Sequence, residues 1–171
     1  MHFLTEIFIS NTFTKSQVSH RLALLKHFLE YSFFSSQENI TLKRIEDYLE
    51  EKKEPKEVIV SFLQWGEDFY GNFNDSNLYN LISQIEEEIK KFPVIYLYVP
   101  VNLNSGNVER IGKWLRQNVE KNILMEIKID FMTAGGCGFV WNNTYYDFSF
   151  SYFLDKKKED FIEVLNKNVK K

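Results

Sequence analysis

The most patterned stretch of this sequence is Ile129–Leu154, which reads IDFMTAGGCGFVWNNTYYDFSFSYFL. Two runs rich in aromatic and β-branched residues flank the pair Asn142-Asn143. Asparagine tolerates the left-handed backbone that a two-residue hairpin turn requires, so the stretch predicts a tight β-hairpin. The turn also fixes the register, which pairs Trp141 with Thr144 and, at the far end, Gly136 with Ser149.

This register divides the hairpin into two faces, because side chains alternate along a strand. We expect one face to be a core face, since it collects large side chains: Cys137, Phe139, Trp141, Tyr146, Phe148 and Phe150. The other face carries smaller and more polar residues: Gly136, Gly138, Val140, Tyr145, Asp147, Ser149 and Ser151. Because the register surrounds Cys137 with aromatic residues, we interpret it as a buried structural cysteine rather than a nucleophile.

The same stretch contains a spaced pattern. An Asp is followed by four residues, a Gly pair, a strand, a turn, a second strand, and Asp-x-Ser with a Leu five residues beyond the Ser. These positions are Asp130, Gly135, Gly136, Asn142, Asn143, Asp147, Ser149 and Leu154. The pattern resembles the C-terminal signature of the delta subunit of F-type ATP synthase, called oligomycin-sensitivity-conferring protein in mitochondria. The family usually has an Arg soon after that Ser, where this chain has Ser151.

Composition indicates a globular protein of one ordinary domain or two small ones, with 171 residues, 44% of them apolar and 16% aromatic. A formal net charge of −3 gives no bulk attraction to nucleic acid or to an anionic membrane. No apolar run approaches the roughly 20 residues that span a bilayer, and Met1–Ser10 does not read as a secretory signal.

The N-terminal half shows helical periodicity. Thr14 is a plausible helix cap before a wide apolar stripe that contains Val18, Leu22, Leu24, Leu25, Phe28 and Leu29. Three further helices are expected: over 40–51 with Thr41 or Asn39 as cap, after Pro55, and from Asp75 or Ser76 to Ile89. A turn is expected over 66–75. Residues 1–12 fit a strand, a docking arm or a first helical turn equally well.

The C-terminal half changes to extended structure at Phe92-Pro93. We expect a strand over 94–101, a helix around Val108–Val119, a second strand over 123–130, and then the hairpin. Asp155 is expected to cap a final helix with inner residues Phe161, Ile162, Leu165 and Val169. The predicted fold class is therefore α+β: an antiparallel helical bundle over 1–92, followed by a small mixed-sheet module over 93–171.

The sequence indicates no catalytic, cofactor-binding or metal site. Glu86, Glu87 and Glu88 spread around a helix instead of converging, and His20 and His27 lie two helical turns apart with no third ligand in view. Asp130 and Asp147 could form an acid/base pair, but no His or phosphate-binding loop joins them, so we interpret them as structural.

The resemblance implies a non-catalytic role that needs no cofactor. In that family the N-terminal bundle holds the tails of the alpha subunits at the catalytic head, and the C-terminal module holds the b-type subunit of the peripheral stalk against rotor torque. Such a subunit lies at the cytoplasmic face of the membrane and contacts the membrane only through the complex. We hypothesise that part of the groove for an alpha tail comes from Leu22, Leu25, Phe28 and Leu29. The family bundle usually has six helices, whereas the sequence indicates four and leaves a fifth undecided.

Two alternatives remain open beside the enzyme that would use Asp130 and Asp147. A small α+β module could bind a small ligand. It could also bind RNA by stacking bases on Tyr145 and Tyr152, with a basic groove built from Arg110, Lys113, Arg116 and the terminal lysines. The charge balance disfavours nucleic acid as a partner.

Overall fold

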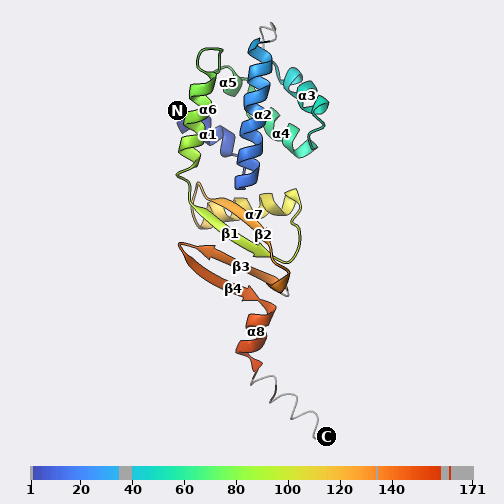
Figure 1. Cartoon of the computed structure of the whole chain (residues 1–171), viewed down its shortest axis with the longest axis vertical. Helices are drawn as coiled ribbons and strands as arrows, with labels where there is room; N and C mark the ends of the chain where they lie inside the picture. Colours follow the sequence, from blue (N-terminus) through green and yellow to red (C-terminus); the bar gives the residue numbers. More distant parts are fainter. Residues whose placement is uncertain (1, 35–39, 134, 159–161, 163–171) are drawn as a thin grey trace. The chain divides into compact units, whose positions relative to one another are not determined.

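The structure, a computed structural model, describes residues 2–34, 40–133, 135–158 and 162 (Figure 1). It confirms the predicted α+β class, with an N-terminal helical region and a four-stranded mixed sheet. The described residues form two compact units. The helical unit comprises the chain up to Pro93 together with Ser105–Leu124, and the sheet unit comprises Val94–Asn104 and the chain from Met125 onward. The helix after Ser105, which the sequence analysis assigns to the second half, thus groups with the helical unit.

Seven helices belong to the described part of the helical unit: α1 His2–Ile9, α2 Lys15–Phe34, α3 Leu42–Glu51, α4 Lys56–Gln64, α5 Gly66–Tyr70, α6 Leu78–Ile89 and α7 Ser105–Asn118. Six of them precede the first strand, so the expectation of four was wrong. Helix α1 shows that the N-terminal segment, for which the sequence left three alternatives, is helical. Helix α5 occupies the first part of the turn predicted over 66–75, and the turn itself follows α5 over 71–77. Gly66, at φ +76°, interrupts the helix, and the chain then resumes it with Phe69 and Tyr70 buried.

The helix starts show how local chemistry selects the boundaries. At α2 the predicted cap is confirmed: the Thr14 hydroxyl accepts a hydrogen bond from the Gln17 amide at 3.1 Å, and the Gln17 side chain accepts one from the Thr14 amide at 3.1 Å. Thr41 caps α3, while the alternative, Asn39, lies outside the described residues. Helix α6 begins after Asn77, later than the predicted caps Asp75 and Ser76.

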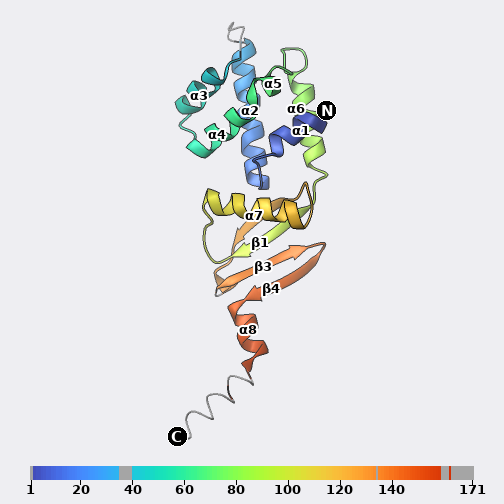
Figure 2. The same ribbon diagram turned by 180° about the vertical axis from the view of Figure 1, so that it is seen from behind.

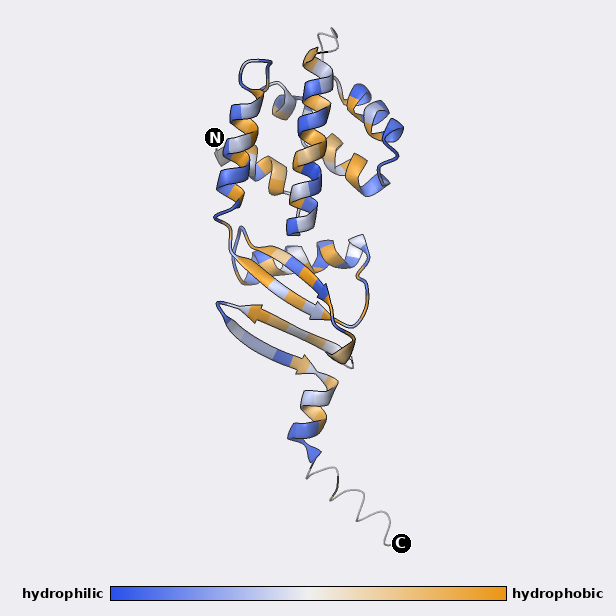
Figure 3. Ribbon diagram, viewed as in Figure 1, coloured by the Kyte–Doolittle hydropathy of each residue, from blue (hydrophilic) through white to orange (hydrophobic). Residues whose placement is uncertain are grey.

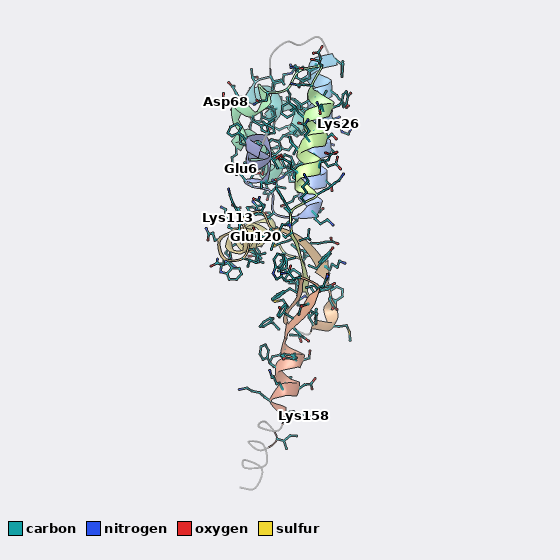
Figure 4. All side chains as sticks on the ribbon, turned by 90° about the vertical axis from the view of Figure 1, so that its left-hand side faces the viewer. Glu6, Lys26, Asp68, Lys113, Glu120 and Lys158 are labelled. Carbon is teal, nitrogen blue, oxygen red and sulfur yellow. The ribbon has the colours of Figure 1, made fainter. Side chains whose placement is uncertain are left out.

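An aromatic cluster fills the core of the helical unit. The ring centroid of Trp65 lies 4.3 Å from that of Phe62 and 5.1 Å from those of Phe8 and Phe69. Burying each such side chain stabilises the fold by roughly 1.5–3 kcal/mol. Hydrophobic bands follow the helices that contribute to this core (Figure 3), whereas charged residues such as Lys26 and Asp68 lie at the surface (Figure 4).

Helix α7 packs on the connection between α1 and α2. Phe13 lies against the backbone of Gly112, and the guanidinium of Arg116 lies 4.7 Å from the centroid of the Phe13 ring. Arg116 also donates hydrogen bonds to the carbonyl oxygens of Ile9 at 2.6 Å and Thr12 at 2.5 Å. Ile9 is the last residue of α1 and Thr12 follows shortly after it, where carbonyl groups lack partners within the helix. Arg116 therefore caps the C-terminal end of α1 from a distant part of the chain.

The sheet has strand order β2-β1-β3-β4, formed by β1 Val94–Val99, β2 Leu124–Ile129, β3 Gly136–Trp141 and β4 Thr144–Ser149. Strands β1 and β2 are parallel, because Pro93 O accepts from Leu124 N and Val99 O accepts from Asp130 N with the same residue offset. Strand β1 pairs antiparallel with β3, which pairs antiparallel with β4. Strand β4 therefore lies at an edge of the sheet (Figures 1 and 2).

The last described helix, α8 Phe150–Lys156, begins earlier than expected. Ser149 is its N-cap, and its hydroxyl accepts a hydrogen bond from the Tyr152 amide at 3.2 Å. The predicted cap, Asp155, lies inside this helix, so that prediction was wrong. Of the predicted inner residues, Ile162 is exposed, and Phe161, Leu165 and Val169 lie outside the described residues.

Candidate interaction surface

The hairpin of β3 and β4 has the predicted turn and register. Asn142 and Asn143 adopt φ values of +49° and +61°, the left-handed pair of a type I′ turn. The strand pairs run from Trp141 with Thr144 to Gly136 with Ser149, so the register is confirmed at every step. The turn thereby decides which side chains share a face.

The aromatic face is where the structure departs from the sequence prediction. Its rings stack, with centroid separations of 4.9 Å between Phe139 and Tyr146 and 5.6 Å between Phe139 and Phe148. Yet Phe148 is 47% exposed and Tyr146 42%. The expectation of a core face was therefore wrong, because β4 is an edge strand whose aromatic side chains remain open to solvent in the described chain. Cys137, on the same face, is half-buried rather than buried.

Two glycines of the signature region are required by close approach. A Cβ at Gly136, which has φ +83°, would overlap the carbonyl oxygen of Phe148 and lie 3.2 Å from Cα of Ser149. A Cβ at Gly138 would overlap the hydroxyl of Tyr145, whose ring crosses that position diagonally. The glycines bring β3 and β4 together and seat Tyr145 on the face opposite the stacked rings.

The two signature aspartates bind the backbone. Asp130 accepts a hydrogen bond from the Met132 amide at 2.9 Å, which shapes the turn after β2. Asp147 accepts one from the Ser149 amide at 2.8 Å. Burial, followed by the nearby charges of Asp147 and Asp130, raises the pKa of Tyr145. Both carboxylates thus hold the backbone in a turn two residues further on: Asp130 after the end of β2, and Asp147 just before α8.

Large apolar side chains are unusually exposed in the sheet unit. We call the following residues the aromatic surface: Phe131, Met132, Tyr146, Phe148, Phe150, Phe153 and Leu154. The two most exposed, Phe131 at 80% and Met132 at 84%, lie in a 3-10 turn, Phe131–Thr133, directly after β2. Exposed apolar residues at this density are typical of interaction sites. Leu154, the last signature position, belongs to this surface, whereas the other seven shape the backbone beneath it.

Sequence reasoning missed Phe131 and Met132 as surface residues. They follow a half-exposed strand and precede the glycine pair, so their position in the chain resembles that of core residues. The signal that identifies them is Asp130, whose side chain forms a turn with the Met132 amide and directs the two residues off the strand.

The residues predicted to contact an alpha tail are buried in the helical unit. Leu25, Phe28 and Leu29 are fully buried and Leu22 nearly so. Buried side chains contact other residues of this chain, so a partner bound along α2 would meet the exposed side of that helix instead. Lys26 and Tyr31 are among the exposed residues of α2.

Two residues of the predicted basic groove make contacts within the helical unit, and the terminal lysines lie outside the described residues. Arg116 is directed into the helical unit, where it binds Ile9 and Thr12, and Lys113 pairs with Glu109 at 2.6 Å. Of the three predicted groove residues on α7, which are Arg110, Lys113 and Arg116, the last two therefore already make contacts within the helical unit. A phosphate backbone would have to compete with both contacts.

The described residues contain no group of three His, Cys, Asp or Glu side chains placed to hold a metal ion. None of the helices in the described ranges is long and apolar enough to cross a membrane. Compared with known proteins, the chain matches no family model and no curated protein.

Proposed function

We propose that this chain is a non-catalytic stator joint of an F-type ATP synthase, similar to the delta subunit. In this role the sheet unit binds a b-type stalk subunit and the helical unit binds the alpha subunits of the catalytic head. The protein would lie peripherally at the cytoplasmic face of the membrane, held there by the complex. The observation that carries the proposal is the aromatic surface, which lies on and beside the hairpin whose sequence pattern resembles the delta-subunit signature.

The chemistry of the aromatic surface suits a partner that stays bound under load. Aromatic side chains offer large contact areas with little rotamer entropy to lose, and slow dissociation depends on such buried apolar contacts. Burying each exposed ring would contribute roughly 1.5–3 kcal/mol. A helix presenting apolar residues along one side is the partner that such a surface fits best.

The helices that precede β1 support the proposal through their number. Six helices precede β1 in the described residues, the number usual for the family bundle. In this proposal Leu22, Leu25, Phe28 and Leu29 set the spacing of the helices around α2 from within, and exposed neighbours meet the alpha tail.

Co-purification tests the proposal directly. The tagged chain is recovered from membranes extracted in mild detergent, and the proteins that accompany it are identified. Alpha, beta and stalk subunits in a fixed ratio would support the joint. A chain recovered free of every ATP synthase subunit would contradict it.

A second candidate, RNA binding, is favoured by the other face of the sheet. The ammonium group of Lys128 lies 5.1 Å from the centroid of the Tyr96 ring, and the rings of Tyr98 and Tyr145 meet edge to face at 6.2 Å. Aromatic side chains beside a cation can stack bases and hold a phosphate. Retention on immobilised RNA that weakens with salt and is lost in Tyr145→Ala would favour this function over the joint.

A further inference from the structure

One arginine in the helical unit is buried among neutral partners. Arg21 is 4% exposed and donates hydrogen bonds to Asn11 O at 2.8 Å, Thr12 Oγ1 at 2.7 Å and Ser61 Oγ at 2.8 Å. In the described ranges, no carboxylate lies within ion-pair distance of it. A buried cation normally has an anionic partner, because neutral oxygens offset only part of its desolvation.

The guanidinium also has incomplete hydrogen bonding. Its Nε is buried and has no acceptor among the described residues. Burial lowers the pKa of Arg21 to about 10, so the group still carries its charge at neutral pH. Arg21 therefore places an uncompensated positive charge inside the unit.

Arg21 lines a pocket of about 420 Å³. The pocket lies between α2, α4, the α1–α2 connection and the first turns of α7, and all its lining residues belong to the helical unit. Gln17 and Gln64 line it as well, and their side-chain oxygens already accept hydrogen bonds from the Phe13 amide and from Asn11 Nδ2. Their NH2 groups are the atoms left to donate to a ligand.

Lys56 adds a second cation to the lining, and two carboxylates oppose it. Glu109 forms an ion pair with Lys113, with 2.6 Å between the charged atoms. Glu57 accepts a hydrogen bond from the Ser105 hydroxyl at 3.3 Å, with no ion pair among the described residues. Val60 and Phe13 supply an apolar wall. The donors outnumber the single unpaired carboxylate.

We propose that this pocket binds an aliphatic carboxylate, carried by an acidic peptide side chain or by a small free acid, with Arg21 as the fixed positive charge. Arg21 and Lys56 attract the anion, the two glutamine NH2 groups donate to its oxygens, and Val60 packs against its aliphatic part. The site does not depend on the proposed joint, because every residue it uses lies in the helical unit.

Two probes distinguish the sources of the carboxylate. The full chain is titrated with glutarate and with a capped tripeptide, Leu-Glu-Leu, while the side-chain amide signals of Gln17 and Gln64 are followed by NMR. The matching Leu-Gln-Leu tripeptide is the control. Shifts caused by glutarate or by the Glu tripeptide, and absent with the Gln tripeptide, support the site; response to glutarate alone assigns it to small acids.

Substitutions at the pocket wall avoid disturbing the hydrogen bonds of Arg21. Val60 is half exposed, so Val60→Glu and Val60→Lys should both fold. Both Val60 variants lose the apolar contact with the ligand, so their difference reports the charge alone: Val60→Glu should bind glutarate about tenfold more weakly than Val60→Lys through like-charge repulsion, and Glu57→Gln should tighten binding. The proposal is overturned if neither carboxylate probe shifts the amide signals, or if Val60→Glu and Val60→Lys bind glutarate equally well.

Discussion

Phe13 lies against Gly112 so closely that no side chain larger than hydrogen fits between them. A Cβ at Gly112 would lie 2.6 Å from Cγ and 2.7 Å from Cβ of Phe13. The contact joins a residue of the α1–α2 connection to a helix almost a hundred positions later in the chain. It allows Arg116, one turn further along α7, to reach Ile9 and Thr12.

Gly112→Ala should destabilise the protein by about 1–3 kcal/mol, because the added methyl group must displace Phe13 or shift α7. Gly71→Ala is the matched control, since a Cβ there would lie at an ordinary 3.5 Å from its nearest neighbour and the backbone is helical. Urea denaturation measures both. Equal stability of the two variants would show that the Phe13 contact is not tight.

Alkaline pH should weaken the fold through Tyr70. Its hydroxyl donates to Phe62 O at 2.9 Å, and burial raises its pKa well above 10. Above pH 10 the unfolded chain loses this proton before the folded chain does, so the free energy of unfolding falls, by up to about 1.4 kcal/mol per pH unit.

Tyr70→Phe should remove the part of the fall in unfolding free energy with pH that Tyr70 causes. Near neutral pH the lost hydrogen bond should lower the free energy of unfolding by about 1 kcal/mol. Burial lowers the pKa of Arg21 and Arg116 to about 10, so these two groups make the free energy of unfolding rise with pH above 10. This contribution is the same in the unmodified chain and in Tyr70→Phe, so it cancels in the comparison. The free energy of unfolding is measured from pH 8 to 11. An unchanged slope in the variant would contradict the assignment to Tyr70.

The hairpin turn should tolerate glycine but not a β-branched residue. Asn143 has φ +61°, so Asn143→Val should cost about 1–2 kcal/mol, whereas Asn143→Gly should change stability little. Chemical denaturation of the two variants checks this. If valine and glycine were equally stable, the turn would have to adopt another backbone conformation.

Ser149 should control the start of α8. Ser149→Ala removes the oxygen that accepts from the Tyr152 amide and should cost about 1 kcal/mol of helix stability. Ser151→Ala is the control, since it removes only the contact between the two hydroxyls. Hydrogen exchange of the Tyr152 amide should accelerate in the first variant and not in the second; acceleration in both would assign the cap to the serine pair.

The aromatic surface should be separable from the fold. Phe148→Glu leaves an already half-exposed side chain in solvent, so circular dichroism should be unchanged. In the proposed joint it should weaken stalk binding about 10- to 100-fold, through the loss of roughly 1.5–3 kcal/mol of apolar contact. Phe34→Glu, at an exposed position in the helical unit, should retain the stalk. Equal stalk recovery with both variants would exclude this face as the docking site.

The hairpin could be predicted from the sequence because its determinants are local. Two asparagines set the turn, the turn sets the register, and alternation sets the faces. Thr14 was equally predictable, since the cap and Gln17 are only three residues apart.

What could not be predicted depends on distant packing. Whether Phe148 is buried is decided by the order of strands in the sheet, and the sequence pattern of a covered face is the same as that of an open one. Arg21 offered one overlooked signal: it lies three residues after Val18 and directly before Leu22, inside the apolar stripe of α2. A charge at such a position indicates a buried polar role, but its partners on α4 and the α1–α2 connection are fixed only by the fold.

The edge position of β4 affects how copies of this chain behave at high concentration. Strand β4 has no strand neighbour on its outer side among the described residues, and Thr144–Ser149 contains neither lysine nor proline, the residues that usually prevent edge-to-edge pairing. Asp147, its one charged residue, is engaged by the Ser149 amide. An isolated copy at high concentration therefore carries its own template for self-association.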